Sequence, residues 1–416
     1  MKPVFSTRAI SRAMRAGDSH RFDLDVIQQG ESLAEALAED VTNRRVALTG
    51  FVQAQARGKP CITYPDYNQT LVLRILAAYI ARRFRTTPPN RDRVVSGVIE
   101  TMMDATPYTV IRRDVSSFYE SVNADALRAR LIYDTSLPRI VRHFLSQYFD
   151  THCPAGKPGL PRGVGLSGIL AELAMEPFDR RVRSLPGVYR YFRYSDDIVI
   201  FCYDGSAEVE TEIETALPHG MHFHPKKRST TPFVEKPSAP RRLDYLGYQF
   251  LTNTGSGGKI PRTVEVSISP DKIKRLKTRV VLSIKRHLAS PEPQLLIDRL
   301  RLLTSNYQLQ RHGVSFWSRR KRVRSGIYYN YRRCGRYDGR TFTSLVPDSL
   351  SGLDNFTHHL LKSPHSEFSA RLRSTLLPAH WTHIGRISFR LGFQGRRLLR
   401  LSYSRLAQAR EAWRNV

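Results

Sequence analysis

Cysteine is scarce in this chain, and its four copies lie far apart. Cys61, Cys153, Cys202 and Cys334 form no C-x-x-C pair within the 416 residues. Isolated cysteines of this kind indicate neither a zinc ribbon nor a disulfide framework. We therefore expect a protein of the reducing cytoplasm.

Long apolar runs are also missing. No stretch reaches the roughly 18 consecutive apolar residues that a bilayer crossing requires, so we expect no membrane-spanning helix and no membrane partner. The acid-free segment from Phe5 to Gly17 resembles an organellar transit peptide. An ordinary first helix after a Ser6 or Thr7 cap is the alternative, and no secretory signal pattern is present.

Acidic residues are heavily outnumbered. The chain has 37 Asp and Glu against 66 Lys and Arg, a formal net charge of +29. Because 41% of the residues are hydrophobic, as in a folded globular protein, the excess positive charge belongs to folded surface. It is spread along the chain and not gathered in one amphipathic helix, which favours nucleic acid over lipid as the anionic partner.

The order of the expected elements predicts an α+β fold. Apolar residues at helical spacing occupy 33–41, 71–84 and 167–182. Strand-like runs occupy 108–111, 188–192, 198–201, 243–251 and 264–268. From Asp271 onward the chain is expected to be mostly helical and basic. We expect an antiparallel sheet that carries helices on one face.

Two adjacent acids stand out in this basic chain. Asp196 and Asp197 separate two strand-like runs, so they are expected at the tip of a tight β-hairpin. Adjacent carboxylates repel each other, which favours a bound cation. Asp114, at the end of another predicted strand, is the best candidate for a third ligand, and an ordinary turn aspartate is the alternative. Nucleotidyl transfer uses two divalent cations about 3.5–4 Å apart, and Mg²⁺ accepts carboxylate oxygens.

Five blocks of sequence follow one another in a recognisable order. They are 113–122 (RDVSSFYESV), Gly159-Leu160-Pro161-Arg162-Gly163 with Ser167, Tyr194-Ser195-Asp196-Asp197, Lys226-Lys227, and 243–248 (LDYLGY). This series resembles the ordered motifs of reverse transcriptases, over about residues 50 to 260. The resemblance implies a right-hand polymerase with fingers, a palm built on an antiparallel sheet, and a thumb.

The resemblance also implies domain bounds and residue roles. The N-terminal extension and fingers would span 1–107, the palm with inserted fingers elements 108–255, and the helical thumb with a basic RNA-binding region 256–416. Asp114, Asp196 and Asp197 are implied as catalytic ligands of two Mg²⁺ ions, with the backbone oxygen of Val115 as a further ligand. Tyr119 matches the bulky residue that excludes a 2′-hydroxyl, and a plain core tyrosine is the alternative. The other implied nucleotide-binding residues are Phe118, Arg162, Gly163, Lys59, Arg91, Arg93, Lys226 and Lys227, and the implied primer grip is Leu246, Gly247 and Tyr248.

Some residues differ from those common in reverse transcriptases, and these differences point to one subgroup of the family. Arg162, Gly168 and Glu172 stand where many retron and intron reverse transcriptases carry Gln, Pro and Asn. The pattern is more similar to bacterial defence-associated, or unknown-group, reverse transcriptases. The segments 303–307 and 326–331 are most similar to the A-type subunit of type 3 antiphage systems. That subtype implies a noncoding RNA template, a DNA product and a second reverse transcriptase subunit as partner.

Cations and aromatic rings interleave between residues 316 and 331. Phosphates bind such charges and unpaired bases stack on such rings, so the segment suits RNA. A solvated charged face is the alternative. The residues expected to bind RNA are Trp317, Arg319, Arg320, Lys321, Arg322, Arg324, Tyr328 and Tyr329.

The sequence thus predicts an RNA-directed DNA polymerase that adds deoxynucleotides to a 3′ end on a noncoding RNA template, in bacterial antiphage defence. One alternative is a catalytically silent, maturase-like RNA-binding or scaffold protein. Another is an untemplated or protein-primed DNA polymerase. An RNA-directed RNA polymerase is a third, against which Tyr119 argues.

Overall fold

The computed structural model describes residues 3–56, 58–104, 106–233, 240–253, 262–312, 321–339 and 341–414. The chain forms two compact units. The first unit contains Met1–Thr101, Thr106–Glu235 and His312–Arg320, and the second contains Met102–Ala105, Lys236–Arg311 and Lys321–Val416. Among the described residues, no helix combines the length and the apolar character that a bilayer crossing requires.

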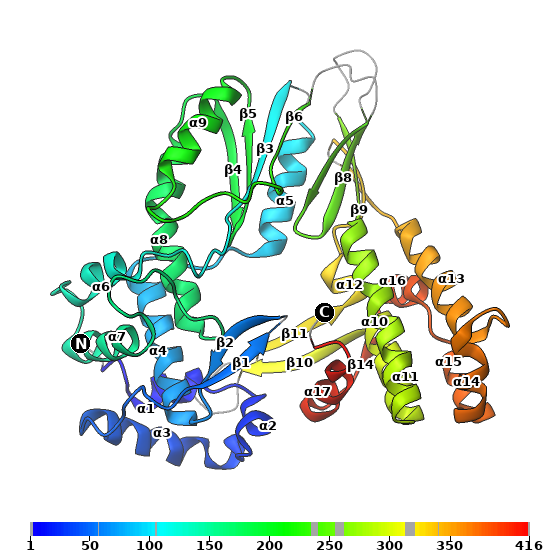
Figure 1. Ribbon diagram of the computed structural model, residues 1–416, viewed down its shortest axis with the longest axis horizontal. Helices are drawn as coiled ribbons and strands as arrows, with labels where there is room; N and C mark the ends of the chain where they lie inside the picture. Colours follow the sequence, from blue (N-terminus) through cyan, green and yellow to red (C-terminus); the bar gives the residue numbers. More distant parts are fainter. Residues whose placement is uncertain are drawn as a thin grey trace. The chain divides into compact units, whose positions relative to one another are not determined.

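A four-stranded antiparallel sheet is the centre of the first unit (Figure 1). Its strands run in the order β4-β5-β3-β6, with bounds Val188–Tyr194, Asp197–Cys202, Tyr108–Asp114 and Ser229–Phe233. The residues of β5 after Asp197 are apolar and buried, as expected for a central strand. The strands predicted at 108–111, 188–192 and 198–201 are confirmed as β3, β4 and β5. Strand β6 was not predicted.

Helices cover both faces of this sheet, so the expectation of helices on one face is wrong. Successive residues of a strand point to opposite faces. Phe192 of β4 packs on α5 (Arg91–Met102), where a Cβ at Gly97 would lie 2.6 Å from the phenyl ring. Arg193, the next residue, reaches α8 (Gly165–Arg183) on the other face, and α9 (Ser206–Ala216) also packs there.

The rest of the first unit is a helical layer with a small hairpin, and side-chain caps start several of its helices. Ser6 caps the first helix, Asp25 the third, Asp66 the fourth and Asn123 the sixth. The Ser6 cap supports the expected ordinary helix near the start of the chain. The elements are α1 Thr7–Ala13, α2 Asp18–Phe22, α3 Val26–Thr42, β1 Val52–Ala56, β2 Lys59–Thr63, α4 Tyr67–Arg83, α6 Ala124–Ile132 and α7 Arg139–His152.

The second unit contains a five-stranded antiparallel sheet in the order β13-β12-β9-β8-β7. Its strands are β7 Arg241–Tyr245, β8 Tyr248–Asn253, β9 Thr263–Ile268, β12 Gly335–Asp338 and β13 Thr341–Ser344. The single strand expected over 243–251 is therefore wrong. Leu246 and Gly247 have positive φ values of 48° and 80°, and this tight turn divides the run into β7 and β8.

Helices and three further short strands complete the second unit, so the expected helical region also contains sheet. Strands β11, β10 and β14 pair in that order, with bounds Lys321–Gly326, Asn306–His312 and Leu398–Leu399. The helices are α10 Pro270–Ala289, α11 Pro293–Thr304, α12 Ile327–Asn330, α13 Asp348–Lys362, α14 Glu367–Thr375, α15 Pro378–Ile384, α16 Phe389–Gly395 and α17 Tyr403–Glu411. The observed class is α+β, as predicted.

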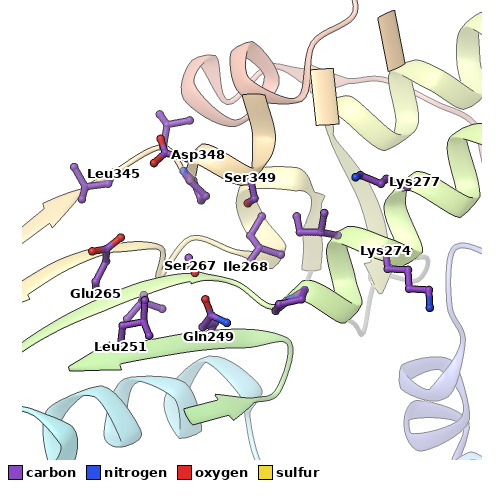
Figure 2. Close-up of a pocket in the computed structure, with 15 residues that line it drawn as sticks. Gln249, Leu251, Glu265, Ser267, Ile268, Lys274, Lys277, Leu345, Asp348 and Ser349 are labelled. Atoms are coloured by element: carbon purple, nitrogen blue, oxygen red, sulfur yellow. The ribbon is translucent and has the colours of Figure 1, made fainter. Parts of the chain in front are cut away.

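One hollow of the second unit lies where the sheet meets the start of α10. It encloses about 690 Å³, and Figure 2 shows Glu265 and Ser267 on the strand side and Lys274 and Lys277 on α10. Acids and bases both border it, and Asp348 marks the start of α13 at its edge. The catalytic carboxylates implied by the sequence motifs all lie in the first unit, so this hollow is not their site.

Candidate active site

The backbone of the first unit brings the three implied carboxylate residues together. Asp114 ends β3, Asp197 begins β5, and these two residues are directly paired across the antiparallel strands. The Val115 amide donates a hydrogen bond of 2.9 Å to the carbonyl of Asp196. Because directly opposed residues share a face of the sheet, Asp114 and Asp197 present their carboxylates on the same side.

A two-residue turn carries Asp196 between its neighbours. Tyr194 pairs with Asp197, which leaves Ser195 and Asp196 as the tip of the hairpin. Ser195 has a φ of 58°, in the left-handed region that tight hairpin turns use. The predicted position of the acidic pair, at the tip of a tight β-hairpin, is confirmed.

Two cations lie against the carboxylates. The Nζ atom of Lys227 is 3.1 and 3.2 Å from the two carboxylate oxygens of Asp114. A guanidinium nitrogen of Arg112 is 3.4 Å from a carboxylate oxygen of Asp197. The Lys227 side chain is 54% exposed and Asp114 only 8%, so the lysine can leave the buried carboxylate for solvent without moving the sheet.

The remaining electrostatics of the site disfavour negative charge. Burial raises the pKa of Asp196, and the nearby charge of Asp114 raises it further. Burial also raises the pKa of Asp197; Arg112 opposes this change, while Asp196 and Asp114 add to it. A divalent cation would relieve both the burial of charge and the mutual repulsion.

These raised pKa values predict how the metal-free protein responds to pH. Each of these carboxyls has a higher pKa in the folded protein than in the unfolded chain. Between those two values the folded state binds more protons than the unfolded state, so the free energy of unfolding falls as pH rises. At pH 7 in a chelator, Asp196→Asn is therefore expected to raise the melting temperature above that of the wild type, and to flatten its dependence on pH. Calorimetry between pH 4 and 8 measures both effects. An unchanged or lower melting temperature would contradict the proposed repulsion.

The donor set suits a hard cation. Carboxylate oxygens are the ligands that Mg²⁺ prefers. In the described part of the chain, no three His, Cys, Asp or Glu side chains gather closely enough to hold a metal ion by themselves. Two of the three carboxylates instead have a cationic side chain beside them, Lys227 at Asp114 and Arg112 at Asp197.

Tyr119 and Arg162 form a second cluster beside the carboxylates. The Arg162 guanidinium stacks 5.1 Å from the centroid of the Tyr119 ring, and its Nη2 atom donates to Glu120 at 2.8 Å. Burial raises the pKa of Tyr119, and the charges of Glu172 and Asp196 act in the same direction. The carboxylate site thus acts electrostatically on Tyr119, and Arg162 contacts one side of its ring.

The loop that carries Arg162 is fixed to the hairpin β1–β2. The Ile62 amide donates to the Arg162 carbonyl at 2.8 Å. Gly163 has a φ of 96°, and a Cβ at this position would lie 2.2 Å from the Ile62 carbonyl oxygen. Only glycine fits this close approach, which explains the Gly163 of the predicted motif.

Several predicted nucleotide-binding residues lie elsewhere in the first unit. Phe118 is 3% exposed and belongs to the hydrophobic core, so its side chain packs inside the fold. Lys59 begins β2 and is close enough to Glu120 to lower the pKa of that carboxyl, after the larger effect of Arg162. Arg91 and Arg93 lie in the first turn of α5. Lys226 is exposed beside Lys227, and it is Lys227 that pairs with Asp114.

The implied primer grip and RNA-binding residues belong to the second unit or lie outside the described residues. Leu246 and Gly247 form the β7–β8 turn, and Tyr248 is buried with its hydroxyl donating to the Asn330 carbonyl at 3.1 Å. Trp317, Arg319 and Arg320 lie outside the described residues, and of Lys321 only the backbone is described. Arg322 and Arg324 are exposed; Arg324 stacks on Tyr329, and Arg396 stacks on Tyr328.

Sequence reasoning missed the buried ion network behind the acidic hairpin. Arg193 is 8% exposed and its guanidinium donates to Asp179 at 2.7 Å, to Glu172 at 2.9 Å and to the Ser195 carbonyl at 3.1 Å. Burial alone would lower the pKa of Arg193, but the hydrogen bonds and charges of Asp179 and Glu172 raise it. The signal in the sequence was two acids seven residues apart on one helix, which places them on one face.

The comparison with known families agrees with the order of the motifs and with this geometry. The family model described as "Reverse transcriptase (RNA-dependent DNA polymerase)" matches residues 60–250. No curated protein matches the chain. The matched stretch begins in β2 and contains all three carboxylates, Tyr119, Arg162 and Lys227. Residues 60–250 therefore form a reverse transcriptase domain, and the protein is a nucleotidyltransferase of the RNA-directed DNA polymerase class.

Proposed function

We propose that this protein adds deoxynucleotides to a 3′ end on a noncoding RNA template, with Asp114, Asp196 and Asp197 as its catalytic carboxylates. The observation that carries the proposal is the direct cross-strand pairing of Asp114 with Asp197. It sets two acids opposite each other and a third in the adjoining turn. Polymerases of this class need such a convergence of acids at one end of a sheet.

Asp114 and Asp196 are the proposed main ligands of two Mg²⁺ ions, and Asp197 and the Val115 backbone oxygen are the further ones. When bound, the ions would activate the 3′-hydroxyl and neutralise the leaving pyrophosphate. Lys227 holds the place of a cation at Asp114 until then, and its exposed side chain is free to turn toward the leaving phosphates. Arg112 stays at Asp197 and fixes the orientation of that carboxylate.

Tyr119 is the proposed sugar filter, and Arg162 keeps its ring in place. The stacked guanidinium limits rotation of the ring, and Glu120 in turn holds the guanidinium with two parallel hydrogen bonds. The Phe118 ring packs edge to face against the Tyr119 ring, with the two centroids 5.5 Å apart. A ring held on two sides is a rigid surface, which is what exclusion of a 2′-hydroxyl requires.

Replacing Tyr119 with alanine is therefore expected to lower the preference for dNTPs over NTPs by about 10-fold or more, because the pocket then accepts the extra hydroxyl. Single-nucleotide incorporation on a primed RNA template measures kcat/KM for each substrate. Tyr119→Phe keeps the ring and serves as the matched control, so it should keep the wild-type preference. If Tyr119→Ala discriminates as well as the wild type, this tyrosine is not the sugar filter.

The proposed domain bounds, partners and biological role follow from the resemblance of the sequence to defence-associated reverse transcriptases. We propose fingers within 1–107, palm within 108–255 and thumb with a basic RNA-binding region in 256–416. The proposed partners are the noncoding RNA template, the DNA product and a second reverse transcriptase subunit, in the cytoplasm of a bacterium during antiphage defence. The exposed Arg322 and Arg324 and the two arginine–tyrosine stacks support an RNA-binding surface in the second unit.

The experiment that tests the proposal supplies purified protein with its copurified RNA, Mg²⁺ and labelled dNTPs. We expect incorporation of dNTPs into a product whose sequence is complementary to that RNA. Absence of incorporation would favour the RNA-binding scaffold, and a product unrelated to the RNA would favour untemplated synthesis. A labelled product that stays attached to the protein after protease-free denaturation would favour protein priming.

A further inference from the structure

Two polar side chains near the end of α7 contact the segments that flank the loop of Arg162. Tyr148 is fully buried, and its hydroxyl is hydrogen-bonded to the Ser167 hydroxyl at 2.7 Å. His152, one helical turn further on, is hydrogen-bonded through Nε2 to the hydroxyl of Tyr64. The rings of Tyr148 and His152 pack edge to face, with their centroids 5.3 Å apart. One end of one helix therefore joins two segments that are about 100 residues apart in the sequence.

Burial keeps these side chains uncharged at neutral pH. It lowers the pKa of His152 to about 4 and raises the pKa of Tyr64 to about 12. The imidazole therefore has one donor nitrogen and one acceptor nitrogen, and the phenol keeps its proton. A buried hydroxyl that loses its partner has no water to replace it, so such a bond is costly to leave unmade. Each contact thus fixes the relative position of the two segments that it joins.

Tyr64 follows the end of β2, and β2 contacts the loop of Arg162. The Ile62 amide donates to the Arg162 carbonyl at 2.8 Å. The Ile62 carbonyl oxygen also lies against Gly163, where a Cβ would be only 2.2 Å away. Thr63 alone separates Ile62 from Tyr64. The hydrogen bond between Tyr64 and His152 therefore fixes the part of the strand that contacts the loop.

The segment before β1 is attached to the same helix. The Leu48 amide donates to the side-chain oxygen of Gln147 at 2.9 Å, and Thr151 Oγ1 donates to the Leu48 carbonyl at 3.3 Å. Strands β1 and β2 pair with each other along their whole length, and most of their side chains are exposed or half-buried. Both ends of this hairpin are therefore anchored on α7.

Ser167 fixes the other side of the loop. It lies in the first turn of α8 and is fully buried, with the Tyr148 hydroxyl as its partner. The loop that carries Arg162 is thus held between β2 on one side and the start of α8 on the other. Its Arg162 guanidinium stacks on the Tyr119 ring, at 5.1 Å from the ring centroid.

We propose that Tyr64, His152 and Tyr148 are positioning residues of the nucleotide site, which hold the Arg162 loop, and through it the Tyr119 ring, in the place that an incoming deoxynucleotide requires. All three lie outside the five sequence motifs. Because they act through the loop and not at the carboxylates, their loss should weaken nucleotide binding more than it slows the chemical step. The proposal rests on the proposed function for the roles of Arg162 and Tyr119 toward the nucleotide.

Tyr64→Phe removes one hydroxyl and keeps the ring. We expect it to raise the KM for a dNTP about 5-fold, the size expected for one lost hydrogen bond, and to change kcat by less than about 2-fold. Single-nucleotide incorporation on a primed RNA template measures both constants. Tyr133→Phe is the matched control, because the Tyr133 side chain is 80% exposed, and it should behave as the wild type.

Variants of His152 separate the hydrogen bond from the packing of the ring. His152→Leu should raise the KM as Tyr64→Phe does. His152→Gln should stay within about 2-fold of the wild type, because an amide can donate to the Tyr64 hydroxyl or accept from it. The double variant Tyr64→Phe/His152→Leu should be no worse than either single variant, since both remove the same bond. A role in packing alone would instead give His152→Gln the same defect as His152→Leu, which would count against the proposal.

Hydrogen exchange follows the loop without any need for polymerase activity. Peptides covering 60–64 and 159–167 should exchange faster in Tyr64→Phe than in the wild type or in Tyr133→Phe. In Tyr148→Phe the peptide covering 159–167 should exchange faster. If the wild type incorporates no dNTP, the proposed function fails, and the exchange result alone decides whether these contacts hold the loop. Unchanged exchange in Tyr64→Phe, or in an active enzyme an unchanged KM, would overturn the proposal.

Discussion

Asp196→Asn is expected to reduce dNTP incorporation by about 10³-fold while leaving the protein folded. Metal-assisted charge stabilisation contributes several kcal/mol to such transfers, and each 1.4 kcal/mol corresponds to a factor of ten in rate. Asparagine keeps the size of the side chain and removes the charge that a cation requires. Its place in the hairpin turn, between Ser195 and the first residue of β5, is unaffected by the exchange. Primer extension under saturating Mg²⁺ measures the effect.

The matched control for this prediction is Glu214→Gln. Glu214 is an exposed acid of α9, so the exchange changes net charge by the same amount at a position away from the hairpin. It should retain wild-type incorporation. Equal incorporation by Asp196→Asn and wild type would mean that the acidic hairpin does not perform the chemistry.

Arg193→Met is expected to lower the free energy of unfolding of the first unit by about 3–5 kcal/mol, because it leaves two buried carboxylates without their cation. Asp179 and Glu172 would then retain charge that the fold can no longer compensate. The Ser195 carbonyl would also lose a hydrogen-bond donor, so incorporation should fall even at temperatures where the variant is folded. Urea unfolding measures the first effect and primer extension the second.

Arg190→Met provides the comparison, since Arg190 lies on the same strand but is exposed. Its replacement should change the free energy of unfolding by no more than about 0.5 kcal/mol. A similar small effect at Arg193 would show that the network is not needed to hold the hairpin. Because Arg193 touches the turn and not the nucleotide, we class it as a positioning residue.

The strands and the convergence of the acids were predictable because the relevant signals are local. Apolar residues before Asp114 and on both sides of the Asp196–Asp197 pair indicate strands, and an acidic pair at a two-residue connection indicates a hairpin. The same local signals failed at 243–251, where the φ values of Leu246 and Gly247 end one strand and allow the next to begin. A continuous pattern of apolar residues does not reveal such a turn.

Features that depend on distant residues were not predictable in the same way. The contact of Lys227 with Asp114 joins the turn before β6 to the end of β3, 113 positions apart in the sequence. Packing of α5 on the second face of the sheet depends on Gly97, whose missing side chain makes room for Phe192.

Anomalous diffraction from crystals of the protein soaked with Mn²⁺ and a dNTP would show whether the acidic residues at the end of the sheet hold the catalytic ions. We expect Mn²⁺ peaks bonded to carboxylate oxygens of Asp114 and Asp196, with the Lys227 ammonium displaced from Asp114. A fully loaded crystal with no peak at these carboxylates, or with Lys227 still paired to Asp114, would contradict it.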